Sequence, residues 1–415
     1  MRNLFKIAFR NLLRYTRRSL LTISLITVGV IFVLVFVSVT GSFKEVIITQ
    51  ITDSFLGDLQ IHRQGYVASI ENLPLTLNLT PEEVSIIERR LQEDREVVAY
   101  STRIRVGGMF SNFTETTNIR LNGVNPEQEF ATCPLLISRI IQGNKDLTAL
   151  QKGNILVPEL LAQGLGINVG DTVVIVATNK DGSVNGKTFV VGGILESATG
   201  PGGRDGYIHL DDAMELLRIR EKEASEIAVN VKSLEQVDRV AQVLQAKLAG
   251  EGEGVEKTRF EVHTWGKLSP FANLVNMIDI MTFFIRLMLI AIVLISILNV
   301  MIMAVYERVR EIGTVAAIGT SPGKILSLFL IEGFFLGVVG TSVGVVLGLG
   351  IILTLYMVKI PFTFGLGGSY ILAPTIPPLE VVTASLMVIV VSILASVQPA
   401  YKASRMEPID ALRHI

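Results

Sequence analysis

Four long apolar stretches constrain the fold of this chain more than any other feature of its sequence. Each is long enough to cross a lipid bilayer, which takes about 20 residues in an α-helix. The mean hydropathy is +0.51 and only 18% of the residues are charged, which is unusual for a soluble protein. We therefore predict four transmembrane helices, over residues 19–43, 277–305, 324–358 and 378–401.

The basic residues at the N-terminus predict the orientation of these helices. Residues 1–18 contain six Arg or Lys and no acid, and such flanks favour the cytoplasmic side. With four spans, residues 306–323 and the tail 402–415 are then also cytoplasmic, and the long segment 44–275 is outside. The basic residues of 1–18 recur every four positions, which predicts an amphipathic helix in the headgroup layer. The alternative is a helix that simply continues the first span, and a bend near Arg17 would exclude it.

The outer segment 44–275 contains both strand and helix patterns without strict alternation, which predicts an α+β domain. Thr80 with Glu82 and Glu83 predicts the start of a helix over 81–92. Further helices are predicted over 156–165 and 234–248, and strands over 57–62, 97–106, 118–124, 171–177, 187–191, 227–231 and 259–263. The predicted fold class is an α-helical membrane protein with four transmembrane helices and an α+β extracytoplasmic domain inserted between spans 1 and 2.

The short connection 306–323 is too polar to lie in lipid, and its apolar residues recur at helical spacing. It predicts a small amphipathic helix at the membrane surface, which Gly319, Pro322 and Gly323 end. A solvated loop is the alternative reading. The spacing from Gly319 to Lys324 differs from a phosphate-binding loop, so we predict that another chain hydrolyses any ATP used.

A stripe of small residues follows in the third span, where glycines recur three or four positions apart. Such a stripe lets a second helix approach closely in lipid. The sequence leaves open whether that helix belongs to the same subunit or to a second one. The helix-packing residues predicted here are Gly333, Gly337, Gly340, Gly344 and Gly348.

Several functional classes find no support in the sequence. The single cysteine, Cys133, excludes an intramolecular disulfide and a Cys-based zinc site, and the four histidines lack ligand spacing. A net charge of −1 gives no sign of nucleic-acid binding. Only Arg286, Glu332 and Asn299 are strongly polar within the spans, which is little for a channel. We predict no metal site, no catalytic residues and no enzymatic activity in this chain.

Three segments resemble the MacB and FtsX-like permease superfamily. The ER-x-R-EIG-x-x-x-A-x-G run from Glu307 to Gly319 is similar to that family's cytoplasmic connection. Residues 11–22 resemble its entry into the first span, and Gln398 to Arg413 resembles its exit from the last. The outer segment, including residues 57–62 and 123–126, is most similar to the lipoprotein-releasing permeases LolC and LolE.

The resemblance implies a permease subunit of an ABC transporter that works by mechanotransmission in the bacterial inner membrane. A separate cytoplasmic ATPase, which holds the ATP and Mg²⁺, would contact the connection, while this chain binds no cofactor. A second permease subunit, identical or homologous, would complete the membrane unit among the lipids. The resemblance implies these ATPase-coupling residues: Glu307, Arg308, Arg310, Glu311, Ile312, Gly313, Val315, Ala317, Ile318 and Gly319.

The most similar relatives imply that the substrate is a lipoprotein, passed to a periplasmic carrier. One alternative is efflux or peptide export on the same membrane scaffold, as in MacB. Another is an FtsX-like regulator that moves no substrate and switches a periplasmic enzyme. Glu307 and Glu311 would pair with basic groups on the ATPase, or instead with Arg308, Arg310 or water.

Overall fold

The computed structural model describes residues 2–197, 205–249, 259–363 and 369–407. The end of the C-terminal motif, including Pro408 and Arg413, lies outside these described residues. The chain divides into two compact units. The helical unit comprises Met1–Glu45, Val275–Phe362 and Ile371–Ile415, and the outer unit comprises Val46–Leu274 and Thr363–Tyr370.

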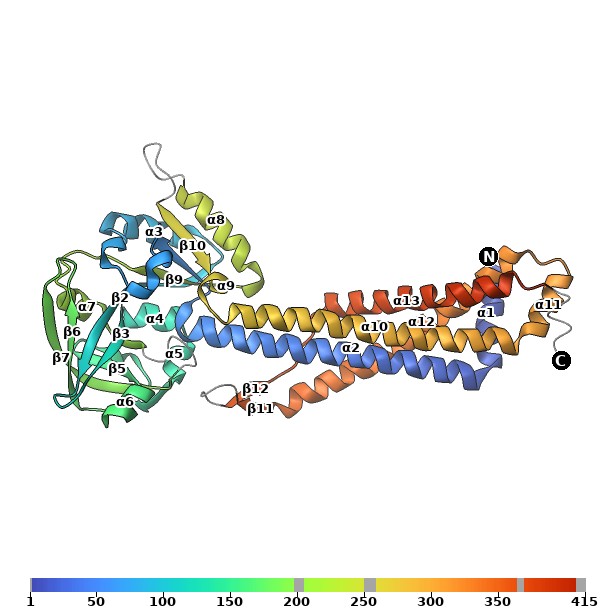
Figure 1. Cartoon of the computed structure of the whole chain (residues 1–415), viewed down its shortest axis with the longest axis horizontal. Helices are drawn as coiled ribbons and strands as arrows, with labels where there is room; N and C mark the ends of the chain where they lie inside the picture. The colour runs from blue at the N-terminus through green and yellow to red at the C-terminus, as the bar shows by residue number, and fades with distance from the viewer. Residues whose placement is uncertain (1, 198–204, 250–258, 364–368, 408–415) are drawn as a thin grey trace. The chain divides into compact units, whose positions relative to one another are not determined.

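The helical unit is built from long helices that run alongside one another (Figure 1). In the described part of the chain, four helices are long and apolar enough to cross a membrane. They are α2 (Thr16–Ile51, extended to Leu56 by a π-turn), α10 (Ala272–Glu307), α12 (Pro322–Val358) and α13 (Pro378–Ser404). Shorter elements precede or join the long helices. These are the helices α1 (Arg2–Arg14) and α11 (Val309–Ala317) and a pair of short strands, β11 (Ile360–Thr363) and β12 (Ser369–Leu372).

Breaks between these helices occur where the backbone changes course. Tyr15 separates α1 from α2, so the N-terminal helix does not simply continue the first long helix. Gly319 has a φ of 93°, a left-handed conformation that favours glycine and follows the end of α11. The prediction that Pro322 and Gly323 end this helix was wrong. Pro322 instead begins α12, where its missing N–H is not needed and its fixed φ suits the first turn.

The outer unit is organised around one ten-stranded mixed sheet with the order β10-β1-β9-β2-β3-β8-β5-β7-β4. Strand β6 pairs with both β2 and β7, so β2, β3, β8, β5, β7 and β6 close into a ring. The strands are β1 (Leu59–Arg63), β2 (Val97–Ser111), β3 (Thr116–Val124), β4 (Ile140–Gly143), β5 (Asn154–Pro158), β6 (Thr172–Thr178), β7 (Val184–Leu195), β8 (Asp205–His209), β9 (Glu226–Val231) and β10 (Phe260–Thr264).

The described part of the outer unit contains three apolar cores, and β2 contributes to two of them. Helices α3 (Pro81–Glu93) and α8 (Val237–Ala249) pack on β10, β1 and β9 to form one core. A second fills the closed ring, together with α6 (Glu159–Leu165) and α7 (Leu210–Leu217). Tyr100 packs against the first core and Phe110 lies inside the second. The remaining helices are α4 (Pro126–Thr132), α5 (Leu135–Ser138) and α9 (Trp265–Leu268).

The predicted elements of the outer segment are largely present. Thr80 caps α3 in a capping box with Glu83, as its sequence predicts. The prediction of one helix over 156–165 was partly wrong, because residues up to Pro158 form strand β5. Leu156 and Val157 are buried in the sheet, and the helix begins only at Glu159. The predicted fold class, four apolar spans with an α+β domain between the first two, is confirmed.

Candidate functional site

The connection between α10 and α12 folds as α11, and its residues divide between two faces. Arg308, Ile312 and Gly313 are buried, whereas Ile318 is 80% exposed. Helix α11 lies at the same end of the long helices as α1 (Figure 1). The surface open to a partner is formed by the other predicted residues, namely Glu307, Arg310, Glu311, Val315, Ala317, Ile318 and Gly319.

A buried ion pair ties the start of α11 to α12. Arg308 Nη1 lies 2.9 Å from Glu332 Oε1, and the two residues are 7% and 2% exposed. Asn11 Nδ2 donates to the same carboxylate oxygen at 2.8 Å. The Arg308 guanidinium also lies over the rings of Tyr15 and Phe329, at 5.4 and 5.6 Å from their centroids. Both buried charges are therefore paired and hydrogen-bonded, which is the condition for tolerating them.

Tyr15, which directly follows α1, joins this arrangement because its hydroxyl donates to Glu311 Oε1 at 2.9 Å. Arg308 Nε donates to the other oxygen of Glu311 at 3.2 Å. Phe335 of α12 receives two aromatic rings of α1 edge-on, at centroid distances of 5.9 and 5.8 Å. We call Asn11, Tyr15, Arg308, Glu311 and Glu332 the Arg308 network. It connects α1, α11 and α12.

The charges of this network stabilise one another. Burial alone would lower the pKa of Arg308, but the carboxylates of Glu332 and Glu311 outweigh it and raise that pKa. Burial likewise opposes ionisation of Glu311, yet the hydrogen bonds from Tyr15 and Arg308 lower its pKa. The bond to Glu311 in turn raises the pKa of the Tyr15 phenol. These interactions stabilise the charged forms of Arg308 and Glu311, with Tyr15 as a neutral donor.

The glycine stripe of α12 contacts two helices of the same chain. A methyl group added at Gly340 or Gly344 would lie 2.7 Å from the Cβ of Ile26 or Val30 on α2. Toward the other end of the stripe, Ser392 Oγ of α13 donates to the carbonyl of Gly333 at 3.1 Å. Of the five glycines, Gly333 and Gly337 face α13, and Gly340, Gly344 and Gly348 face α2.

The other polar residues of the spans have different surroundings. Arg286 Nη2 lies 3.4 Å from Glu380 Oε2, with both side chains partly exposed. Asn299 is exposed on α10, among apolar residues. Among the described residues, no group of three or more His, Cys, Asp or Glu is placed to hold a metal ion.

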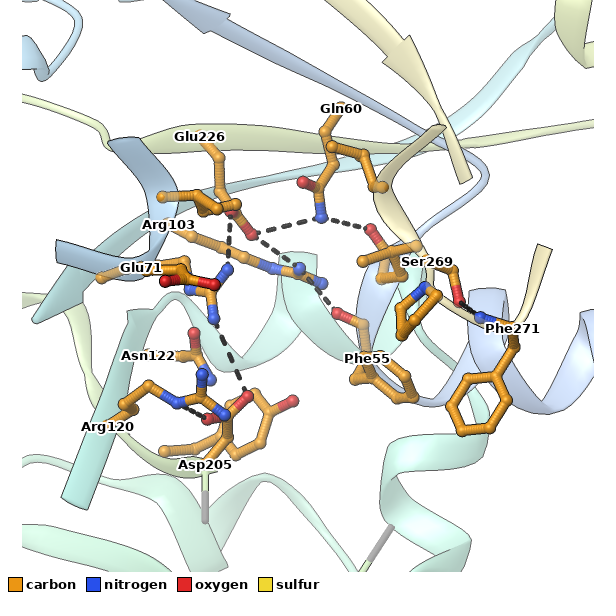
Figure 2. A pocket seen from close by; sticks show the side chains of 16 residues that line it. Phe55, Gln60, Glu71, Arg103, Arg120, Asn122, Asp205, Glu226, Ser269 and Phe271 are labelled. Atoms are coloured by element: carbon orange, nitrogen blue, oxygen red, sulfur yellow. Dashed lines mark hydrogen bonds and ion pairs between the residues drawn. The ribbon is translucent and has the colours of Figure 1, made fainter. Parts of the chain in front are cut away.

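The outer unit contains a second buried charge cluster, centred on Arg103 of β2 (Figure 2). Arg103 donates to both oxygens of Glu129, at 2.7 and 2.9 Å, and to Glu226 Oε1 at 3.1 Å. Burial opposes ionisation of Glu226, but Arg105 and then Arg103 outweigh it and lower the pKa of that carboxyl well below its usual range. These charges are thus held in the interior by mutual pairing.

This cluster also completes the hydrogen bonding at the end of the first long helix. The last carbonyls of a helix have no partner within the helix. Here Arg103 Nη1 donates to the Phe55 carbonyl at 2.8 Å, and Gln60 Nε2 donates to the Leu56 carbonyl at 2.7 Å. Arg139 Nη1 reaches the Ser54 carbonyl at 3.3 Å. Three side chains of the outer unit therefore hold the end of this helix.

These features define a class: a multi-pass membrane protein with a periplasmic-type α/β domain between its first two spans and a short polar helix between the next two. Residues 19–247 match the MacB-like periplasmic core domain, and residues 283–408 match the FtsX-like permease C-terminal region. The chain belongs to the family of ABC-transporter permeases that combine these two domains. The resemblance inferred from the sequence motifs is confirmed.

Individual relatives differ in how much of the chain they cover. The lipoprotein-releasing system transmembrane protein LolC of Xylella fastidiosa is 24% identical over 71% of this chain and 72% of its own length. The macrolide export ATP-binding/permease protein MacB of Nitrosomonas europaea is 35% identical, but over 28% of this chain and 16% of its own length. The crystal structure of the periplasmic region of MacB from Actinobacillus actinomycetemcomitans aligns with 52% of this chain and 94% of its own, with 14% identity and a TM-score of 0.34.

Sequence reasoning missed much of what surrounds the predicted residues. Arg308 was placed on the partner-facing surface, but its guanidinium turns inward to Glu332. Asn11 and Tyr15 belong to the same network although they precede it by about three hundred positions. One signal was present: Glu332 is an acid in an apolar span, and such a residue requires a nearby cation.

Proposed function

We propose that this permease serves lipoprotein release, extracting lipoproteins from the inner membrane toward a periplasmic carrier. The observation that carries this proposal is the similarity to a lipoprotein-releasing system protein across 71% of the chain. Depletion of the protein should leave outer-membrane lipoproteins in the inner membrane. Correctly placed lipoproteins after depletion would contradict the proposal.

Export of a drug, siderophore or peptide is the second candidate. It is supported by the higher identity, 35 to 37% over about 120 residues, to macrolide and pyoverdine export permeases. Deletion would then cause sensitivity to the exported compound while lipoproteins stay correctly placed. Normal drug sensitivity together with misplaced lipoproteins would exclude this candidate.

We also propose that the exposed face of α11 contacts a separate cytoplasmic ATPase, which binds ATP and Mg²⁺. Val315 and Ile318 would fill an apolar groove on that ATPase, and the exposed carboxylates would pair with its basic groups. Glu311→Lys should uncouple ATP hydrolysis from transport or prevent assembly, because it reverses the charge and removes the acceptor for Tyr15. Glu311→Gln keeps a hydrogen-bond acceptor and is the matched control. Normal co-purification and transport with Glu311→Lys would contradict this assignment.

The orientation that we propose places both termini and α11 in the cytoplasm and the outer unit in the periplasm. The chain's single cysteine is buried, so a Cys133→Ala background suits site-directed labelling. A cysteine at Thr320 should be protected from an impermeant maleimide in intact cells, while one at Lys180 should react. Labelling of both from outside would contradict the orientation.

A second permease subunit is supported by the exposed Asn299 on α10. An amide in contact with lipid lacks hydrogen-bond partners, and a polar residue of a second helix would supply one. Asn299→Cys on the Cys133→Ala background should form a cross-link to a second permease, a homodimer if the subunits are identical. Absence of cross-links, with efficient cross-linking of an assembled control complex, would place Asn299 toward lipid.

A further inference from the structure

A cavity of about 380 Å³ lies inside the outer unit, beside the Arg103 cluster. Its walls include Phe55 and Leu56 at the end of the first long helix and residues 268–271, which precede α10. Cavities of this size are typical of small-molecule sites. The segments that lead to and from the two membrane helices therefore share one cavity.

The cavity is apolar on one side and charged on the other. Phe55 and Phe271 turn their rings toward it from one side, and Arg120, Asn122 and Asp205 face them in Figure 2. Other apolar side chains continue the first wall, including those of Leu268 and Pro270. Such a division suits a ligand with a polar head and an apolar chain.

The cations of the polar wall differ in how fully they are paired. Arg103 takes both oxygens of Glu129 and shares Glu226. Arg105 makes one long hydrogen bond to Glu226 Oε2, at 3.4 Å, and lies 3.8 Å from Asp205. A guanidinium has five N–H donors, and among the described residues the guanidinium of Arg105 makes this one hydrogen bond, so its other donors can reach an acceptor in the cavity.

Arg120 is the second available cation. Its Nε lies 2.8 Å from Asp205 Oδ1, and its side chain is 36% exposed. Arg105 and Arg120 thus share Asp205 and part of Glu226. Glu71, which is exposed, also lines the cavity and adds a negative charge there.

We propose that this cavity binds a single-chain amphiphile with an anionic head. The head, a carboxylate or phosphate monoester, is held by Arg105 and Arg120, since guanidinium groups bind such anions in a fork geometry. The chain lies against Phe55, Leu268 and Phe271. This site lies within one outer unit, goes beyond the proposed transport function, and its test needs no ATPase.

Trp265, the only tryptophan of the chain, provides a reporter because it begins the short helix that carries Leu268. The full chain is reconstituted in phosphatidylcholine vesicles and titrated with dodecanoate or dodecyl phosphate, and Trp265 emission is followed. We expect a saturable change. Arg105→Gln or Arg120→Gln should weaken binding about ten- to a hundredfold, because a hydrogen bond to a charged group contributes about 1.5–3 kcal/mol.

The matched control is Arg63→Gln, a partly buried arginine of β1 that does not line the cavity and should bind as the wild type does. Phe271→Ala tests the apolar wall without touching the charge cluster and should also weaken binding. Tighter binding of dodecyl phosphate than of dodecanoate would indicate that the natural ligand derives from a phospholipid. Tighter binding of dodecanoate would indicate a fatty acid. Both results support the proposal.

Three results would overturn it. Equal affinity of the wild type and both arginine variants would show that the anionic head does not bind Arg105 or Arg120. Equal binding of uncharged dodecyl maltoside would show that the cavity does not require a negatively charged ligand. Inorganic phosphate or acetate alone could give the same arginine-dependent response, with no gain in affinity from the alkyl chain of the ligand. That result would show that the cavity binds small anions and not an amphiphile.

Discussion

Replacing Arg308 by methionine would test whether the Arg308 network holds α11 in place. Met retains most of the apolar volume but leaves the Glu332 carboxylate buried without its cation. Removing one partner of a buried ion pair costs about 3–5 kcal/mol, against about 0–1 kcal/mol for an exposed pair. The hydrogen bond that Asn11 donates to Glu332 survives, so we expect a loss near 3 kcal/mol.

A double-mutant cycle isolates the contribution of the pair. Arg308→Met, Glu332→Leu and the double variant are unfolded in mixed micelles, and the loss of helical circular dichroism is measured. The double variant leaves no buried charge and should be more stable than either single variant. The control is Asp279→Asn, which breaks the more exposed pair with Lys44, whose atoms lie 2.8 Å apart, and should cost less than about 1 kcal/mol.

Two results would refute this reasoning. If Arg308→Met costs no more than the control, the pair is hydrated and does not fix α11. If the two single losses simply add in the double variant, Arg308 and Glu332 do not interact as their 2.9 Å separation implies.

Three further predictions concern other parts of the chain. Gly344→Leu should disrupt packing of α12 on α2, at a cost of several kcal/mol, whereas Gly350→Leu, where an added Cβ meets nothing within 4 Å, should be tolerated; thermal unfolding compares them. Burial raises the pKa of Asp58 to about 6, so its folded carboxyl binds protons more tightly than the unfolded one, and stability should fall as pH rises from about 4 to above 6. Asp58→Asn should flatten this dependence by about 2–3 kcal/mol, as measured by hydrogen exchange of β9. Arg103→Met should destabilise the outer unit by about 3–5 kcal/mol, since the buried Glu129 loses its cation and Glu226 keeps only Arg105 of its two arginines, and protease resistance of that unit checks it.

Each of these has a clear contrary outcome. Equal melting of the two leucine variants would mean that the helices separate easily at the stripe. An unchanged pH profile in Asp58→Asn would show that this carboxyl is hydrated. Wild-type protease resistance in Arg103→Met would mean that water or a neighbouring cation replaces the guanidinium.

The membrane helices and the fold class could be predicted because their signals are local. A run of apolar residues specifies a span by length alone, and Thr80 with Glu83 specifies a helix start within four positions. The error at residues 156–165 arose where the buried strand β5 runs directly into α6 at Pro158 and Glu159. Periodicity cannot separate a short buried strand from a buried helix.

The candidate site was predictable only on its exposed face. A motif can mark Glu307 to Gly319, but it does not show which side chains turn inward. The inward direction of Arg308 depends on Glu332, and the charge of Arg103 depends on Glu129 and Glu226, which come from other elements. These pairings are properties of the tertiary fold, and a single sequence without aligned relatives gives no register for them.

Strand β2 contributes to two cores of the outer unit, pairing with β9 in its first half and with β3 and β6 in its second. Unfolding of either of these two cores would therefore displace β2 and remove its packing contacts from the other core. We conclude that the outer unit unfolds cooperatively, as one foldon. The closed ring of strands therefore does not fold as a separate fragment when the chain is cut only at the loops that flank it.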